Sequence, residues 1–318
     1  MIKEQVVTHP RLCIATCTRG RPEMLLRMLS SFESLHQPEG VELIALVVEN
    51  DTVSSLASVV SEKSAQLKFP LHYCWEERLG IPIARNRCLQ EAKALGSTHV
   101  IFIDDKERAH ENWIAEYWRF AQSREDNGEG EVFVEGQVQS IMPAGIPSYM
   151  TEFFQREVRQ TGANILACTT ANVWMPLSLV EQYALSFDES DPFAGGTDTK
   201  IFTQAREAGA ALYYCAEALV YEDLPAERFN WSWLAKRRFR CGVTDGELQV
   251  FDRSHSRAKY LFKRMWSVFL NGLKSAVYGL LLQRKKSLKY YLKSYRKAGE
   301  LMGAQGHRVQ SYQSVDGN

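Results

Sequence analysis

The sequence predicts an α/β protein whose core is an open sheet of mainly parallel strands. Through the first hundred residues, short apolar runs alternate with segments in which apolar residues recur every three or four positions. The run V-E-L-I-A-L-V-V-E-N-D (41–51) is almost continuously apolar, as expected of a strand covered on both faces. Strands and helices that alternate in this way form parallel sheets flanked by helices.

Four strands and three helices are predicted in this first part. We expect strands at 11–19, 41–51, 71–75 and 98–105, and helices at 22–32, 53–66 and 81–95. Pro22 suits the first turn of a helix. Ligands of such sheets bind beyond the carboxyl ends of the strands. The polar residues that follow three strands, Thr16–Arg19, Glu49–Asp51 and Asp104–Glu107, therefore predict one shared site.

The second part is predicted to mix strands and helices. Strands are expected at 131–139, 171–176 and 211–225. A loop at 187–202 leads into a helix, with Asp198 near the helix start. Helices rich in aromatic and basic residues are expected from Pro225 to about 303, followed by a polar, flexible tail.

Composition and missing motifs exclude several classes of protein. The seven cysteines form no C-x-x-C pair, so neither a zinc site nor a disulfide framework is predicted. The motifs G-x-G-x-x-G, G-x-x-x-x-G-K-[ST], H-E-x-x-H and G-x-S-x-G are absent, which argues against dinucleotide oxidoreductases, P-loop enzymes, zinc proteases and α/β-hydrolases. The first ten residues lack the apolar segment of a signal peptide, so we expect a cytoplasmic protein.

Five motifs in a fixed order carry a resemblance to a known family. They are C-T-R-G-R-P-E-M-L-L-R-M-L-S-S (17–31), V-V-E-N-D (47–51), L-G-I-P-I-A-R-N-R-C-L (79–89), V-I-F-I-D-D-K-E (100–107) and F-D-E-S-D-P-F-A-G-G-T-D-T-K-I-F (187–202). Together they resemble the inverting glycosyltransferases of family 2 with the GT-A fold, within the bacterial branch that includes succinoglycan glucosyltransferases. The resemblance covers about residues 10–245. Segment 221–242 is similar to the same branch, in which an acid, a proline and an Arg-x-x-x-Gly-like turn recur.

The resemblance implies a GT-A open mixed sheet flanked by helices, with a basic helical extension at the C-terminus. The catalytic domain would be residues 1–225, with a nucleotide-binding half at about 10–108 and an acceptor half at about 130–225. A helical basic region (226–303) and the flexible tail (304–318) would follow. The implied activity is inverting transfer of a sugar, most simply a UDP-linked hexose, to a saccharide or lipid-linked acceptor in bacterial surface polysaccharide synthesis. The alternative is a non-catalytic, membrane-associated relative in polysaccharide assembly.

The resemblance also assigns roles to individual residues. Asp198 matches the catalytic base, although an aspartate there can also simply cap the helix. Glu49 and Asp51 could equally belong to a solvated loop, and Arg85 could equally pair with a surface acid. The residues matched to the nucleotide-sugar donor are Thr16, Thr18, Arg21, Glu49, Asp51, Arg85, Asp104, Asp105 and Lys106.

Lys106 departs from the family pattern. The D-x-D motif of the family has a metal-binding aspartate where this chain has Lys106, and the usual G-G-E-D-T-D is G-G-T-D-T-K here. Three explanations remain: Asp105 and Glu107 hold Mn²⁺ or Mg²⁺, Lys106 itself supplies the positive charge to the diphosphate, or activity has been lost. The retained Asp198, Asp104 and Arg85 argue against lost activity. Of the other two explanations, we favour weakened or absent metal dependence over ordinary use of Mn²⁺.

The C-terminal region predicts an anionic partner. Residues 253–318 contain 14 Lys or Arg and two acids, a net charge of +12, so residues 1–252 carry −12. Between 257 and 298 the basic residues flank a broad apolar stripe, which is typical of a helix lying on an anionic membrane. A helix packed on the catalytic domain explains the pattern nearly as well, and nucleic acid is disfavoured for want of a binding motif. We expect peripheral attachment to the inner face of the plasma membrane.

Overall fold

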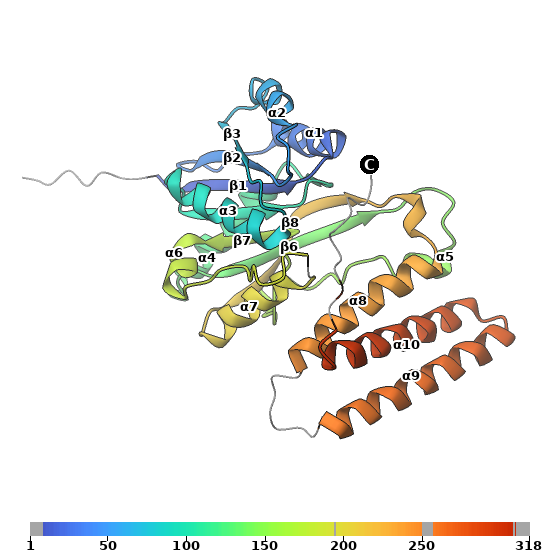
Figure 1. Cartoon of the computed structure of the whole chain (residues 1–318). Helices are drawn as coiled ribbons and strands as arrows, with labels where there is room; N and C mark the ends of the chain where they lie inside the picture. The colour runs from blue at the N-terminus through green and yellow to red at the C-terminus, as the bar shows by residue number, and fades with distance from the viewer. Residues whose placement is uncertain (1–8, 194, 250–256, 308, 310–318) are drawn as a thin grey trace, which may run out of the picture.

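The fold is organised around one mixed sheet (Figure 1). The computed structural model describes residues 9–193, 195–249, 257–307 and 309. Within these residues, eight strands hydrogen-bond in the order β3-β2-β1-β4-β7-β6-β8-β5. Their bounds are β1 Arg11–Thr18, β2 Glu42–Glu49, β3 Leu71–Trp75, β4 His99–Ile103, β5 Glu107–Ala109, β6 Phe133–Ile141, β7 Asn172–Pro176 and β8 Leu212–Asp223. The predicted α/β sheet is therefore confirmed.

The first four strands in this order are parallel and end at one edge. Thr18 at the end of β1 lies opposite Glu49 at the end of β2, which in turn lies opposite Trp75 at the end of β3. β4 pairs with the other side of β1 and is followed at once by Asp104. The register thus brings the polar strand ends together, as the sequence predicts.

Helices cover both faces of the sheet and form two apolar cores. One core contains buried side chains of α1 (Pro22–Ser31), α2 (Ala57–Ser64) and α4 (Trp113–Asp126). The other contains side chains of α3 (Ile81–Ala94), α6 (Leu177–Gln182) and α7 (Thr197–Glu207). With both faces covered, the central strands are apolar along their length, which explains the continuous apolar run in β2. The short helices η1 Phe32–Ser34, α5 Ser148–Thr151 and η2 Ala226–Arg228 lie in connections.

The second half of the sheet is joined to the first by an antiparallel strand. β7 runs antiparallel to β4 and β6, whereas β6 and β8 are parallel with an irregularity at Gly136–Gln137. The buried Asn172 donates to the carbonyls of Gln137 (3.0 Å) and Ala218 (2.8 Å). Its carbonyl accepts hydrogen bonds from Trp113 and Tyr117 of α4. One side chain thus ties α4 to three strands of the sheet.

Three long helices follow the sheet: α8 (Trp231–Gln249), α9 (Arg257–Leu280) and α10 (Arg284–Ala304). α10 lies between α8 and α9 (Figure 1). The predicted Arg-x-x-x-Gly turn is wrong, because Arg238–Gly242 lies inside α8. Of the expected flexible tail, Ala304 still belongs to α10, and residues 308 and 310–318 lie outside the described residues.

Glycines set the close approach of α8 and α10. A Cβ added to Gly242 would lie 2.1 Å from the carbonyl oxygen of Arg296, and one on Gly303 would lie 2.0 Å from that of Val243. Gly246 and Gly299 make equally tight approaches. Both helices therefore present a Gly-x-x-x-Gly pair, and their backbones touch where a larger residue would hold them apart.

The variant Gly299→Ala should separate these two helices, because an added Cβ would lie 2.1 Å from the carbonyl oxygen of Phe239. Relative to Gly272→Ala in α9, whose added Cβ would meet nothing nearer than 3.9 Å, it should lower the free energy of unfolding by about 1–3 kcal/mol. Both substitutions gain the same helix propensity, so the difference isolates the steric effect. Urea denaturation monitored by circular dichroism measures it. Equal stability of the two variants would contradict the tight contact.

Candidate active site

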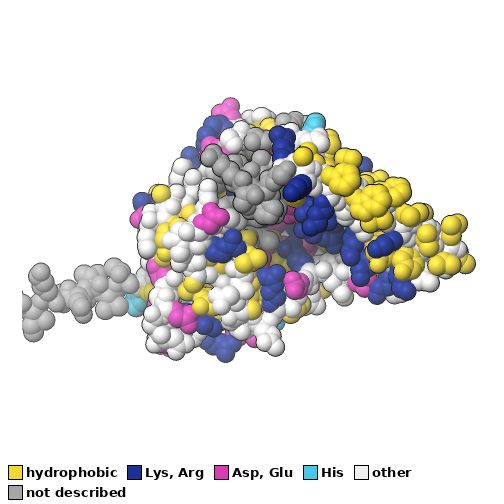
Figure 2. Space-filling model, turned by 90° about the horizontal axis from the view of Figure 1, so that it is seen from below, with side chains coloured by type: hydrophobic (Ala, Val, Ile, Leu, Met, Phe, Trp, Pro, Cys, Tyr) yellow, Lys and Arg dark blue, Asp and Glu magenta, His cyan; other side chains and the backbone are white. Residues whose placement is uncertain are grey.

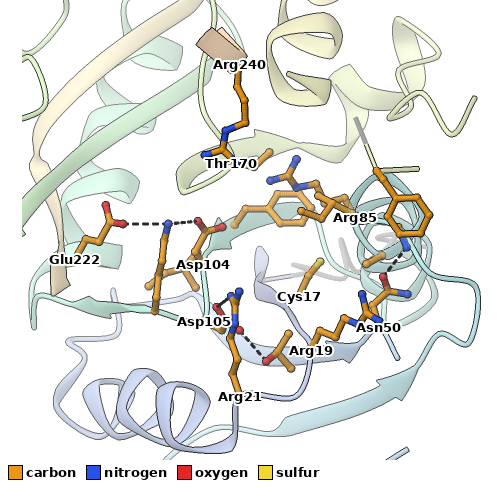
Figure 3. A pocket seen from close by; sticks show the side chains of 18 of the residues that line it. Cys17, Arg19, Arg21, Asn50, Arg85, Asp104, Asp105, Thr170, Glu222 and Arg240 are labelled. Carbon is orange, nitrogen blue, oxygen red and sulfur yellow. Dashed lines mark hydrogen bonds and ion pairs between the residues drawn. The ribbon is translucent and has the colours of Figure 1, made fainter. Parts of the chain in front are cut away.

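A cavity of about 360 Å³ opens at the carboxyl ends of the parallel strands. One wall comes from the ends of β1, β2 and β4 and from the start of α3. The opposite wall comes from β8 and α8, elements that lie more than 100 residues further along the chain. Figure 3 shows side chains from both walls pointing into the same space. The site is therefore assembled between the two halves of the sheet and the C-terminal helices.

Asp105 is held in place from the first wall. Its side chain is almost fully buried and accepts a hydrogen bond from the hydroxyl of Thr18 (2.8 Å). Arg21 lies 3.3 Å from its other oxygen (Figure 3). Burial raises the pKa of Asp105, although Arg21 and Thr18 favour the ionised form. Both carboxylate oxygens are thus engaged by residues of the protein.

Lys106 bridges two carboxylates across the cavity. Its Nζ lies 3.4 Å from Asp104 Oδ2 and 3.0 Å from Glu222 Oε1 (Figure 3). Burial works to lower the pKa of Lys106, but the charges of Asp104, Glu222 and Glu107 outweigh it and raise the pKa above its ordinary value. The ammonium group is therefore fully charged at neutral pH.

Glu222 is the centre of this cluster of charges. Besides Lys106, its carboxylate contacts Arg156 at 2.9 Å and Arg228 at 3.4 Å. Burial works to raise the pKa of Glu222, but Lys106 and Arg156 outweigh it and hold the pKa well below its usual range. Three cations thus share this one buried carboxylate.

The lining as a whole is strongly cationic. Eight basic side chains line the cavity, namely Arg19, Arg21, Arg85, Lys106, Arg156, Arg228, Arg237 and Arg240. Three acidic side chains accompany them: Asp104, Asp105 and Glu222. The excess of five positive charges matches an anion such as a nucleoside diphosphate.

The loop before α7 is fixed against α3. The Asn86 side chain both accepts from the amide of Phe187 and donates to its carbonyl, each at 2.8 Å. Gly80, with φ of +149°, faces Pro192 so closely that an added Cβ would lie 2.4 Å away from it. Arg85 donates to Thr197 Oγ1 at 3.0 Å. These contacts hold the first turn of α7, and hence Asp198, beside the cavity.

The structure brings some of the predicted site residues together and leaves others apart. Six of them line the cavity: Thr18, Arg21, Arg85, Asp104, Asp105 and Lys106. Five lie outside its lining: Thr16, Glu49, Asp51, Glu107 and Asp198. Asp198 is half-buried in the first turn of α7, and its Oδ1 accepts a hydrogen bond from the amide of Thr199.

Glu49 holds a loop. Its fully buried carboxylate accepts hydrogen bonds from the amides of Ser55 and Leu56 and from the hydroxyls of Ser55 and Tyr73. Burial works to raise the pKa of Glu49, but these hydrogen bonds lower it below its ordinary value. The carboxylate thereby shapes the segment between β2 and α2, and the neighbouring Asn50 is the residue that reaches the cavity.

The carboxylates near Lys106 are each engaged by other groups of the protein. Asp104 pairs with Lys106, and Asp105 pairs with Arg21. Glu107 is fully buried, accepts from the amide of Asp104, and lies 3.7 Å from Arg156; burial raises its pKa well above the ordinary value. Within the described part of the chain, no three His, Cys, Asp or Glu side chains gather in a way that could hold a metal. Asp105 and Glu107 as metal ligands remain an untested prediction.

Sequence reasoning missed most of the second wall. The missed lining residues are Arg156, Thr170, Phe193, Glu222, Arg228, Trp233, Arg237 and Arg240, whereas Arg19 and Asn50 belong to the strand-end segments that the sequence predicts. Trp233, whose place the sequence does not decide, stacks on Phe154, and the guanidinium groups of Arg228 and Arg237 lie over its ring. The sequence signal that could have revealed them is the segment 221–242, which is similar to the same family branch and contains five of these residues.

The mixed sheet flanked by helices corresponds to an α/β fold of the GT-A type. A family model described as "Glycosyltransferase like family 2" matches residues 10–244, and the chain belongs to this family. The succinoglycan biosynthesis protein ExoM of Rhizobium meliloti (strain 1021) is 29% identical over 264 residues, which cover 82% of this chain and 81% of ExoM.

Solved structures of S. aureus TarS share the fold. The 1–349 fragment in complex with UDP has a TM-score of 0.53 at 14% identity, covering 96% of this chain and 95% of the fragment. A longer TarS structure also has a TM-score of 0.53 at 14% identity, covering 93% of this chain. The chain spans about half of that longer protein, at 54%. The predicted family and fold are thus confirmed.

Replacing Glu222 by glutamine should destabilise the protein, because Lys106, Arg156 and Arg228 would lose their shared counter-charge. We expect the free energy of unfolding at pH 7 to fall by about 2–3 kcal/mol. The neighbouring Asp223→Asn is the matched control, since its pair with Arg108 is about 40% exposed on both sides and should contribute less than about 1 kcal/mol. Urea titration compares the two, and equal losses would contradict the central role of Glu222.

Proposed function

We propose that this family 2 glycosyltransferase transfers a hexose from a UDP-linked donor, with inversion, to a saccharide or lipid-linked acceptor of a bacterial surface polysaccharide. The observation that carries the proposal is the excess of five positive charges in the cavity at the strand ends. The names of the relatives support the choice of donor and pathway. ExoM is named for succinoglycan biosynthesis, and TarS has been crystallised with UDP and with UDP-GlcNAc.

Both walls of the cavity would contact the donor. Cys17–Arg19, Arg21 and Asn50 on the first wall lie where β1 and β2 end, which is where a nucleoside binds in open α/β sheets. Lys106 bridges the two walls by contacting Asp104 and Glu222. Arginines of η2 and α8, namely Arg228, Arg237 and Arg240, face the first wall from the other side. A diphosphate between the walls would meet charged donors on both sides. These donors would also stabilise the negative charge that grows on the nucleoside diphosphate as it leaves.

Asp198 would act as the base. In inverting transfer, an acceptor hydroxyl forms a bond to the anomeric carbon while the bond to the diphosphate oxygen breaks on the opposite face. The hydroxyl proton passes to a carboxylate, and the bonding electrons leave with the diphosphate. Asp198 lies in the first turn of α7. The Arg85–Thr197 hydrogen bond joins this turn to the cavity.

Lys106 would take the electrostatic place of a metal ion. An ammonium group is a compact charge that binds phosphate well. Here it stands between two carboxylates that fix its position, and Arg156 and Arg228 also contact Glu222. A divalent cation at this point would have to displace Lys106 or share the space with it. We therefore expect donor binding without Mn²⁺ or Mg²⁺.

Calorimetric titration of UDP in EDTA tests this expectation. The wild-type chain should bind, and Lys106→Ala should bind roughly 10–100-fold more weakly, because a charged contact is lost. Lys93→Ala, a lysine on the exposed side of α3 that pairs with Glu181, should bind as the wild type does. Lys106→Asp restores the acid of the family motif and should bind UDP only with Mn²⁺. Wild-type binding that itself requires Mn²⁺ would contradict the proposal.

The role of Asp198 is tested by Asp198→Asn. UDP release from UDP-hexoses, with water or extracted membrane lipid as acceptor, should fall by about 10²–10⁴-fold, because the general base is lost. UDP affinity should remain unchanged. The control is Glu207→Gln, at the exposed far end of the same helix. A wild-type chain that binds UDP but never releases it from any donor would instead favour a non-catalytic relative.

A further inference from the structure

α9 turns its apolar side away from the protein. The apolar face of α9 consists of Phe262, Met265, Trp266, Phe269, Leu273 and Val277, whose side chains are 45–68% exposed. Their spacing of three, four and seven residues places them on one stripe of the helix. Seen from below, Figure 2 shows this stripe as an apolar ridge bordered by Lys and Arg side chains. Isolated exposed apolar residues are common, but a continuous ridge marks an interaction surface.

The opposite side of α9 faces α10 with polar contacts. Ser275 is buried and donates to the carbonyl of Ser287 (3.0 Å), and Ser287 donates back to the carbonyl of Ser275 (2.8 Å). Ser294 donates to the carbonyl of Val268, and Arg264 pairs with Glu300 at 2.7 Å. A helix of a water-soluble domain buries its apolar stripe against the core and exposes its polar side. α9 has the reverse arrangement.

Small residues complete the contact between α9 and α10. A Cβ on Gly279 would lie 3.4 Å from Ser287 Oγ, and one on Gly272 would lie 3.9 Å from Ser294 Oγ. Helices associate through small residues and serine hydrogen bonds where the surroundings are as apolar as the side chains themselves. The packing of α9 is therefore suited to a lipid environment on its outer side.

The charges around the apolar face point to anionic lipid. Lys259, Lys263 and Lys274 are exposed and follow one flank of the stripe. Residues 257–304 contain 12 Lys or Arg and one acid, Glu300, so this pair of helices carries +11. Trp266, which packs against Phe269, is a residue type that favours the boundary between headgroups and acyl chains. None of the helices that the structure describes is long and apolar enough to cross a membrane.

We propose that the apolar face of α9 lies flat on an anionic lipid bilayer, with its lysines among the headgroups. A second copy of the chain is the less favourable occupant, because two faces that each carry this positive charge would repel one another. An anionic surface supplies the opposite charge, and its acyl chains accept the aromatic and aliphatic side chains. The proposal concerns a surface remote from UDP chemistry and stands whether or not the proposed transfer is correct.

Vesicle flotation of the full-length chain tests the proposal. We expect flotation with vesicles of phosphatidylcholine and phosphatidylglycerol, little with phosphatidylcholine alone, and a loss of binding at high salt. The triple variant Trp266→Ser, Phe269→Ser, Leu273→Ser should bind roughly tenfold more weakly or worse. The matched control removes three equally exposed apolar side chains elsewhere, by Val53→Ser, Val158→Ser and Leu166→Ser, and should float as the wild type does.

A second triple variant and the oligomeric state distinguish lipid binding from dimer formation. Lys259→Gln, Lys263→Gln and Lys274→Gln leave the apolar face intact and should weaken only the binding to anionic vesicles. Light scattering should find a monomer in the absence of lipid. A wild-type chain that binds no vesicle, or a dimer that the triple serine variant dissociates, would overturn the proposal. Equal losses in the triple serine variant and its matched control would overturn it as well.

Discussion

The site depends on one ion cluster, in which Glu222 holds Lys106, Arg156 and Arg228. These four side chains come from the end of β8, the turn between β4 and β5, the loop before β7 and the helix η2. A buried carboxylate with three cations is stable only when all of them are in place, because each partner removed leaves a charge uncompensated. The cluster therefore fixes the second wall of the cavity and, through Lys106, joins it to Asp104 on the first wall.

Much of the first wall could be predicted from the sequence, because it is built from local patterns. Apolar runs and helical spacing locate β1 to β4 and α1 to α3, and parallel strands must end at one edge. Thr18, Asp104 and Lys106 accordingly lie where the sequence predicts. The same reasoning could not predict that Glu49 hydrogen-bonds to the following loop. In a sequence, a carboxylate at a strand end has the same pattern whether it binds a nucleotide or holds a loop.

The second wall could not be predicted, because it arises from contacts between distant segments. Arg156 follows no strand end, and it reaches the site only because β6 and β8 pair in parallel and bring Glu222 beside it. Arg237 and Arg240 lie on a helix whose basic residues, in the sequence, resemble an ordinary solvated face. The close approach of α8 and α10 could not be predicted from the sequence either, because Gly-x-x-x-Gly pairs indicate a contact only when the partner helix is known.

The C-terminal helices connect the cavity to the apolar face of α9 through contacts that allow little movement of one helix relative to another. Trp233, Arg237 and Arg240 of α8 line the cavity, and two residues after Arg240 its glycines begin to touch the backbone of α10. α10 in turn holds α9 through paired serines. Contacts made by backbones and short side chains permit less sliding than contacts between long flexible side chains, so the spacing between the cavity and the apolar face is fixed by helix diameters. On a bilayer, this arrangement would keep the cavity at a constant height above the headgroups. That is the geometry an enzyme needs when its acceptor is anchored in the membrane and its donor arrives from solution.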